Sequence, residues 1–119
     1  MLSVHIDKIG ELAVVECGGR LVQIEATIKL RDAVVSQRDA RIVVLELSEV
    51  NAIEGGGLST LVFLRRWARA HNIRFMLFDP SKCVRDGLKR LRATSEFSIP
   101  TLDEMMALLA YASSRYATV

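Results

Sequence analysis

Three consecutive glycines, residues 55–57, follow Glu54 and precede the hydroxyl side chains of Ser59 and Thr60. Backbone N–H groups at a glycine-rich helix start can hold a phosphate, and a carboxylate there interacts favourably with the helix dipole. The segment lacks the Lys-Ser/Thr pair of a P-loop and the G-x-G-x-x-G spacing of a dinucleotide site, so a nucleotide site is the weaker interpretation. The glycines indicate instead a tight turn that packs a helix closely on a sheet, or a surface that a partner approaches closely.

Outside this segment, no arrangement of residues predicts catalysis. His5 and His71 are isolated and have no ligand-like spacing. Cys17 and Cys83 also lack metal-site spacing, which predicts two reduced structural thiols rather than a disulfide. No Ser-His-Asp arrangement or acid pair stands out from the background. The sequence therefore predicts a protein that is not an enzyme and needs no metal and no cofactor.

The elements on either side place the glycines at the end of a strand. Residues 42–47 form a short, β-branched apolar run bounded by polar residues, which is typical of a buried strand. A short loop is expected next, and then a helix from the glycines to about His71. This order of strand, glycine turn and helix puts the turn at the carboxyl end of a sheet strand, where open α/β proteins build their sites. The expected core side of the helix holds Leu58, Leu61, Leu64 and Ala68.

Further elements are expected along the rest of the chain. Residues 4–9 and 12–17 predict a hairpin around Gly10, followed by a turn at Gly18-Gly19. A helix is expected at 24–36, a strand at 73–78, a third helix after an N-cap at Ser81, and a short edge strand at 97–99. Residues 101–104 fit a capping box before a last helix. The core sides are expected to hold Ile24, Ile28, Ala33 and Val35 in the first helix, Val84, Leu88 and Leu91 in the third, and Leu102, Met105, Met106 and Leu109 in the last.

Length and composition agree with an ordinary globular protein. The 119 residues are half hydrophobic and a quarter charged, with a net charge of +2, which predicts a single domain spanning residues 1–119. The alternation of expected strands and helices along the chain indicates an α/β layer fold with a partly parallel sheet. So small a net charge does not favour nucleic-acid binding. No run reaches the roughly 18 apolar residues of a membrane span, and the N-terminus lacks the features of a signal peptide. A cytoplasmic protein without membrane insertion is therefore expected.

The glycine-led helix carries apolar residues on a second side. Phe63 and Trp67 lie four residues apart, away from the expected core side, with Arg65, Arg66 and Arg69 around them. A helix that is apolar on two sides is either deeply buried or bound to a partner. Two interpretations stay open: Trp67 packs beneath a neighbouring helix or terminus, or it belongs to a partner-binding surface.

The residues Leu47–Leu58, L-S-x-V-x-x-I-E-G-G-G-L, resemble the signature of the STAS domain of bacterial anti-sigma factor antagonists, D-L-S-x-V-x-x-I/M-D-S-S-G-L. The order of elements is similar over nearly the whole chain. The resemblance implies a mixed sheet of four to five strands packed with about four helices, and a non-enzymatic regulatory module that binds a kinase-type anti-sigma factor by partner switching. In that family signature, the second serine of the adjacent S-S pair is the phosphorylated residue. Gly56 stands at that position, and Gly55 offers no adjacent hydroxyl, so the usual phosphoacceptor is expected to be lost.

The same resemblance implies a protein-binding surface around the motif and the helix that follows. A homodimer is left open. The residues expected to contact the partner are Asn51, Glu54, Gly57, Ser59, Thr60, Phe63, Arg66 and Trp67.

A second setting for the same fold is also consistent with the glycines. The segment E-G-G-G-L is similar to the D-T-G-G-L form of the STAS subunit that sits on the ATPase of bacterial phospholipid ABC transporters. That alternative predicts an ABC ATPase as the partner and no phosphorylation. An enzyme or ligand-binding domain that uses the glycine segment ranks last.

Overall fold

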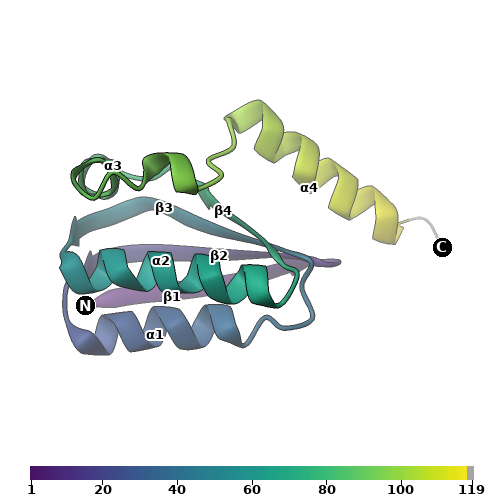
Figure 1. The fold of residues 1–119 in the computed structure, drawn as a ribbon. Coiled ribbons are helices and arrows are strands. Elements are labelled where there is room, and N and C mark those ends of the chain that lie inside the picture. The colour runs from purple at the N-terminus through teal and green to yellow at the C-terminus, as the bar shows by residue number, and fades with distance from the viewer. Residues whose placement is uncertain (118–119) are drawn as a thin grey trace.

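The protein is built around one four-stranded sheet with the strand order β1-β2-β3-β4 (Figure 1). The computed structural model describes residues 1–117, with side chains described for residues 1–114. The strands are β1 (Leu2–Ile9), β2 (Leu12–Leu21), β3 (Ile42–Ile53) and β4 (Arg74–Phe78). β1 runs antiparallel to β2, and β2, β3 and β4 are parallel to one another. This mixed sheet confirms the predicted fold class, and residue Ser98 adds only an isolated bridge to Met76 beside β4.

The helices cover the two faces of the sheet unequally. They are α1 (Ile24–Val35), α2 (Gly55–Ala70), α3 (Lys82–Arg90) and α4 (Leu102–Ala117), with a short 3-10 helix η1 (Thr94–Glu96) between the last two. α1 and α2 lie side by side against one face, whereas α4 crosses one end of the opposite face (Figure 1). The main core therefore lies between the sheet and α1, α2 and α3.

Period-two alternation along the strands sorts the apolar residues between the two faces. On β3, Val43, Leu45 and Leu47 enter the main core, and Val44 points into the smaller core under α4. The expected core side of α2 is confirmed, since its four predicted residues are all buried. The largest side chains that are fully buried in the main core are those of Leu21, Leu30, Leu45, Leu47, Leu61, Leu64, Leu77 and Leu88.

Two of the expected turns are instead parts of strands. Gly18 and Gly19 lie within β2, which continues to Leu21, and Gly19 has a φ of 100° at a register shift against β3. β3 likewise continues past the expected end at residue 47 to Ile53. The reason is the same in both cases, because each extension pairs with the other and keeps its backbone groups hydrogen-bonded. The expected loop before the glycines therefore shrinks to Glu54 alone.

The predicted core side of α1 was wrong. Its core stripe is Ala26, Leu30 and Val34, whereas Ile24 is 70% exposed and Ile28 is 40% exposed. Ile24 and Ile28 each lie two positions from a stripe residue, about 200° around the helix, so they face away from the sheet. Spacing alone could not separate the two sides because both carry apolar residues. Ala33 and Val35 flank the stripe and are half-buried.

The core sides of α3 and α4 were predicted only in part. Val84 and Leu88 are buried as expected, but Leu91 follows the end of α3 and is 52% exposed, while Ala93 and Phe97 enter the core in its place. In α4, Met105 is buried and Leu109 half-buried. Leu102 and Met106, at 64% and 56% exposure, lie on the outer side of α4 because the helix meets the sheet along one stripe only.

The capping box before α4 is confirmed. The Thr101 backbone N–H donates to Glu104 Oε1 at 2.9 Å, and the Glu104 N–H donates to Thr101 Oγ1 at 3.1 Å. Hydrogen bonding of the Glu104 carboxylate to the Thr101 backbone N–H, and secondly to the Thr101 hydroxyl, lowers the pKa of the Glu104 carboxyl. These reciprocal bonds explain where α4 begins.

Candidate functional site

Three helices begin along one edge of the sheet. Because β2, β3 and β4 are parallel, their carboxyl ends meet at the same edge, where α1, α2 and α3 start (Figure 1, left). Leu21, the last residue of β2, pairs with Ile53, the last residue of β3. The predicted placement of the glycines at the carboxyl end of a strand is therefore confirmed. We call residues 51–57 the β3–α2 junction.

Glu54 is the single residue between β3 and α2, and it is exposed. Its backbone is extended (φ −123°, ψ −178°), and its carbonyl accepts from the Leu58 N–H at 3.0 Å. The Glu54 side chain forms no capping hydrogen bond with the helix. The carboxylate belongs to an exposed residue near the positive end of the helix dipole, where a negative charge is favoured.

The three glycines occupy two different environments. Gly57 is buried, and a Cβ added there would lie 2.6 Å from the carbonyl oxygen of Leu21 and 2.8 Å from Cγ1 of Ile53. At Gly55 and Gly56, an added Cβ would meet nothing within 4 Å, and both residues are exposed. None of the three has a positive φ. The tight-packing interpretation thus holds for Gly57, whereas no steric requirement explains Gly55 and Gly56.

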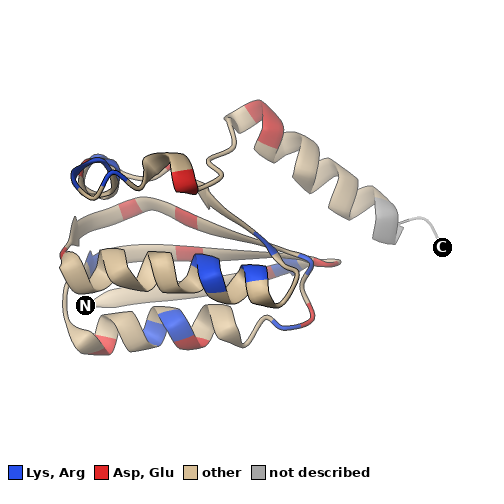
Figure 2. Cartoon of the chain, viewed as in Figure 1, with Lys and Arg blue, Asp and Glu red and all other residues tan. Residues whose placement is uncertain are grey.

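The solvent side of α2 presents a ridge that begins at these glycines. We define the α2 ridge as Gly56, Ser59, Phe63 and Arg66, which are all exposed and lie three or four residues apart. Phe63 is 47% exposed, and its ring is the largest apolar group on the ridge. The arginines of α2 lie in the half of the helix away from the glycines, so the first turns carry no charge of their own (Figure 2).

The other predicted contact residues differ in whether their side chains are exposed to a partner or already hydrogen-bonded within the protein. Asn51, near the end of β3, is exposed. Ser59, which carries a hydroxyl group on the ridge, is exposed as well. The Thr60 hydroxyl donates to the Gly56 carbonyl at 2.8 Å, so it is engaged within the helix. The junction and the ridge bring Asn51, Glu54 and Ser59 to the same end of α2.

Trp67 lies at the border between the core and the surface. It is half-buried and packs against the main core. Its ring stacks on His71 with the ring centroids 4.6 Å apart, and His71 Nδ1 lies 2.8 Å from the Trp67 carbonyl oxygen. This environment favours the packing interpretation for Trp67 and leaves Phe63 as the exposed aromatic residue of α2.

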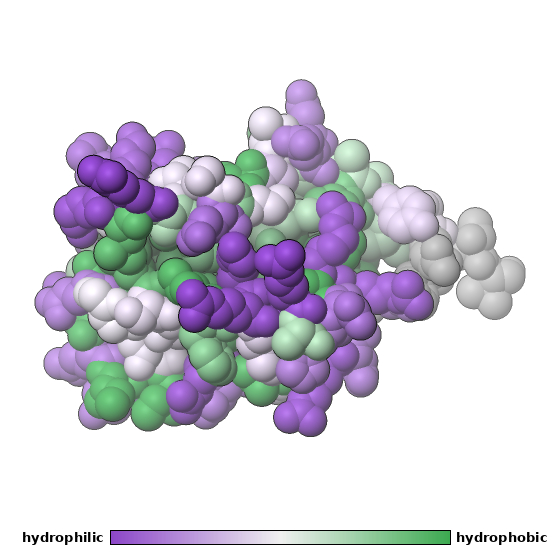
Figure 3. Space-filling view, viewed as in Figure 1, coloured by the Kyte–Doolittle hydropathy of each residue, from purple (hydrophilic) through white to green (hydrophobic). Residues whose placement is uncertain are grey.

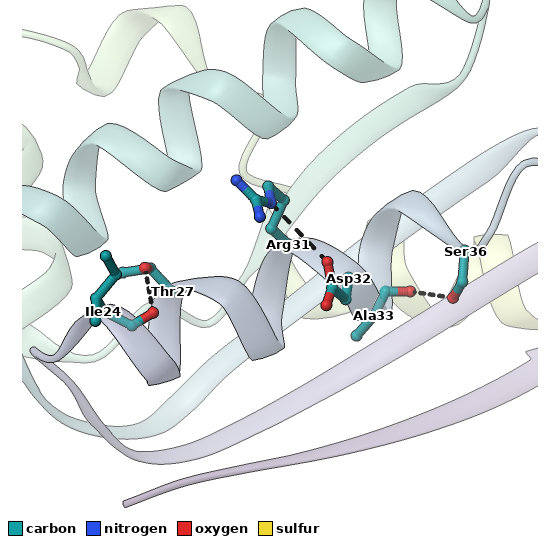
Figure 4. Close-up of polar contacts among 6 residues, drawn as sticks. All are labelled: Ile24, Thr27, Arg31, Asp32, Ala33 and Ser36. Atoms are coloured by element: carbon teal, nitrogen blue, oxygen red, sulfur yellow. Dashed lines mark hydrogen bonds and ion pairs between the residues drawn. The ribbon is translucent and has the colours of Figure 1, made fainter.

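The start of α1 adds apolar surface that the sequence interpretation assigned to the core. Ile24 and Ile28 are exposed on α1, which packs beside α2. In the space-filling view, hydrophobic atoms over the start of α1 lie below paler atoms over the start of α2 (Figure 3). Arg31 points from α1 toward α2, and its Nε lies 3.9 Å from Asp32 Oδ1 (Figure 4). No sequence signal separated these isoleucines from core residues, since only the choice of helix side decides their exposure.

The β3 residue just before the junction is hydrogen-bonded to α3. Cys83, near the start of α3, donates through Sγ to the Val50 carbonyl at 3.3 Å. The Ser81 hydroxyl lies 3.3 Å from the same sulfur, although Ser81, at the predicted N-cap position, forms no side-chain cap.

Both cysteines are free, and burial, followed by the charge of Glu46, raises the pKa of the Cys17 thiol to about 12. The described residues contain no group of three or more His, Cys, Asp or Glu side chains placed to hold a metal ion.

Comparison with known proteins identifies the family. Residues 5–105 match the family model of the STAS domain, so the chain belongs to the STAS domain family. A comparison with curated protein sequences gave no match. Within residues 1–117, no helix is both long and apolar enough to span a bilayer.

Solved structures share the fold at low sequence identity. An anti-sigma factor antagonist from Mycobacterium paratuberculosis has a TM-score of 0.76 at 17% identity, over 92% of this chain and 95% of that one. The anti-sigma factor antagonist SpoIIAA in its unphosphorylated form has a TM-score of 0.74 at 14% identity, over 92% and 97%. A variant of RsbS from Moorella thermoacetica has a TM-score of 0.72 at 15% identity, over 93% and 97%. The mixed sheet with its four helices is thus the STAS fold.

Proposed function

We propose that this chain is a non-enzymatic regulatory module of the cytoplasm that binds a protein partner through the β3–α2 junction and the α2 ridge. The observation that carries the proposal is the contrast among the glycines. Gly57 is required for packing, but Gly55 and Gly56 are exposed and surrounded by open space. A helix start without side chains lets a partner's backbone approach closely, and Phe63 beside it supplies an apolar anchor.

The partner that we propose is a kinase-type anti-sigma factor. Support comes from the fold shared with proteins described as anti-sigma factor antagonists and from the motif at residues 47–58. In this proposal Gly56 occupies the position of the phosphorylated serine. It has no hydroxyl, and the nearby Thr60 hydroxyl is bound to the Gly56 carbonyl. In this proposal, binding is either constitutive or controlled by something other than phosphorylation of the junction.

The test uses the kinase-type anti-sigma factors encoded in the same genome. The full chain is titrated against each of them, and the mixture is then incubated with ATP and analysed by intact mass. We expect a complex with one of them and no added phosphate. Gly56→Ser is expected to gain one phosphate, since the space around residue 56 accepts a side chain. Stoichiometric phosphate on Ser59 or Thr60 of the unaltered chain would contradict the loss of the switch.

The glycines also support a second partner, the ATPase subunit of a bacterial phospholipid ABC transporter. The exposed Gly55-Gly56 pair offers no phosphoacceptor, which suits a constitutive subunit better than a switch. Titration of the ATPase subunit against the same chain separates the two proposals. Binding to the ATPase with no affinity for any anti-sigma factor would replace the first partner by the second while keeping the same surface.

A further inference from the structure

A second surface lies away from the junction, where three distant segments enclose a groove of about 460 Å³. Its floor includes Leu88 and Pro80, which are buried, and Phe78, which is half-buried. Ile99 and Leu102, at 37% and 64% exposure, form an apolar rim on the side of α4. The volume falls within the roughly 300–1,000 Å³ of sites that hold ligands. The full lining is Phe78, Asp79, Pro80, Arg85, Leu88, Lys89, Thr94, Ile99, Pro100, Thr101 and Leu102.

The wall of the groove formed by α3 is strongly basic. Residues 82–92 contain five lysines and arginines and a single acidic residue, Asp86, which pairs with Lys82 at 2.9 Å. The hydrogen bond from Lys82, followed by the charges of Lys82, Lys89 and Arg90, lowers the pKa of the Asp86 carboxyl. Figure 2 shows Lys and Arg positions in blue along much of the α3 ribbon.

Two of these cations, Arg85 and Lys89, line the groove. Arg85 and Lys89 are exposed, lie one helical turn apart, and form no ion pair with any of the residues that the structure describes. Asp79 also lines the groove, at its β4 end, without pairing with either cation. The groove therefore combines an apolar floor and rim with two positive charges along one wall, neither of which forms an ion pair with the described residues.

We propose that this groove binds an acidic amphipathic helix of a partner protein. Apolar side chains of that helix occupy the groove floor and contact Ile99 and Leu102, and its carboxylates face Arg85 and Lys89. The charge complementarity and the apolar lining together select this occupant. A lipid surface fits less well, because the apolar side chains of α3, Val84 and Leu88, are buried in the core and cannot enter a bilayer.

This docking site is separate from the proposed partner surface. The groove is built from α3, the end of β4 and residues 99–102, and it includes no residue of the junction or the α2 ridge. The two surfaces can therefore be occupied independently. A variant of Phe63 tests whether binding at one of them depends on the other.

The probe is a synthetic peptide of about four helical turns, with leucines on one side and glutamates on the other. A second peptide of the same length carries lysines in place of the glutamates. Binding to the full chain is measured by fluorescence anisotropy, and the site is mapped by amide chemical shifts in NMR spectra. We expect the acidic peptide to bind, to shift the amide signals of residues 85–89, 99, 101 and 102, and to leave those of the α2 ridge unchanged.

The variant Arg85→Glu/Lys89→Glu is expected to weaken binding of the acidic peptide at least tenfold. The matched control Arg31→Glu/Arg38→Glu makes the same change in net charge at exposed positions outside the groove and should alter affinity less than threefold. Phe63→Ala should leave this binding unchanged. Circular dichroism melts confirm that the variants remain folded.

Three results would overturn the proposal. The basic peptide could bind as tightly as the acidic one, or the control variant could weaken binding as much as the groove variant. The chain could also fail to bind the acidic peptide and bind phosphatidylglycerol vesicles through Arg85 and Lys89, which would assign the basic surface to a membrane.

Discussion

At the scale of single residues, the glycine triplet shows how one residue type serves different purposes within one helical turn. Gly57 lets α2 start in contact with the ends of β2 and β3, because the Leu21 carbonyl and the Ile53 side chain occupy the space of a Cβ. Gly55 and Gly56 face solvent, where a side chain would fit. Substitution at these positions should therefore have opposite effects on stability.

We expect Gly57→Ala to lower the free energy of unfolding by about 1–3 kcal/mol, because the added methyl group must displace backbone atoms. The matched control Gly56→Ala should raise it by up to about 1 kcal/mol, since alanine fits there and favours the helix. Urea denaturation of both variants measures the difference. Equal stabilities would show that the close contact at Gly57 relaxes without cost.

Cys17 predicts a dependence of stability on alkaline pH. Its pKa is raised from 9.0 to about 12 in the folded protein, so the folded state holds the thiol proton more tightly than the unfolded chain does. The stability from this group is complete below pH 9 and is lost as pH rises toward about 12, at up to about 1.4 kcal/mol per pH unit.

Denaturation at a series of alkaline pH values checks this prediction. Cys17→Ala should have a shallower loss of stability above pH 9 than the unaltered chain. The matched control Cys83→Ala removes the other, half-buried thiol. A Cys17→Ala variant with the same slope as the unaltered chain would mean that other groups cause the loss.

At the scale of elements, α2 separates its two aromatic residues into different roles. Phe63 stands on the ridge at 47% exposure, whereas Trp67 packs against the core and stacks on His71. Both lie on the side away from Leu58 and Leu61 in a helical projection, so the sequence could not distinguish them. The distinction depends on what the neighbouring elements cover.

We expect Phe63→Ala to weaken partner binding about thirtyfold or more, corresponding to at least ~2 kcal/mol, with stability changed by less than about 0.5 kcal/mol. Trp67→Ala should instead lower the free energy of unfolding by about 2 kcal/mol or more, since it leaves a gap at the edge of the core. Met106→Ala, at an exposed apolar position on α4, is the control for both. Thermal melts and binding titrations measure the two effects, and strong binding by Phe63→Ala would remove the ridge from the interface.

The end of α4 nearest the groove depends on its capping box. Thr101→Ala removes the side-chain bond to the Glu104 N–H and should cost about 1 kcal/mol. Because Met105 follows this turn and is buried in the smaller core, amide hydrogen exchange in residues 102–106 should accelerate in this variant. Thr94→Ala, outside any described capping bond, is the control. Unchanged exchange would indicate that packing alone holds the start of α4.

At the scale of the whole molecule, the fold was predictable because local patterns agreed with one another. The buried strand at 42–47, the core side of α2 and the capping box at 101–104 each indicated their elements, and their order specified an α/β fold with four helices. The sides of α1 and α4 were not predictable, since Ile24, Ile28, Leu102 and Met106 suit either a core or an exposed position. The groove was also inaccessible to sequence reasoning, because residues 78–80, 85–89 and 99–102 meet only in the folded chain.

The exposed pair Gly55-Gly56 has a thermodynamic consequence for any complex at the junction. Glycine loses more backbone entropy on ordering than any other residue, and these two form the first turn of α2, where no side chain restrains them. A partner that clamps this turn should bind with a favourable enthalpy and an unfavourable entropy. Titration calorimetry with Gly55→Ala should then show a smaller entropic penalty, while Gly57, held between β2 and β3, keeps the rest of the helix in place.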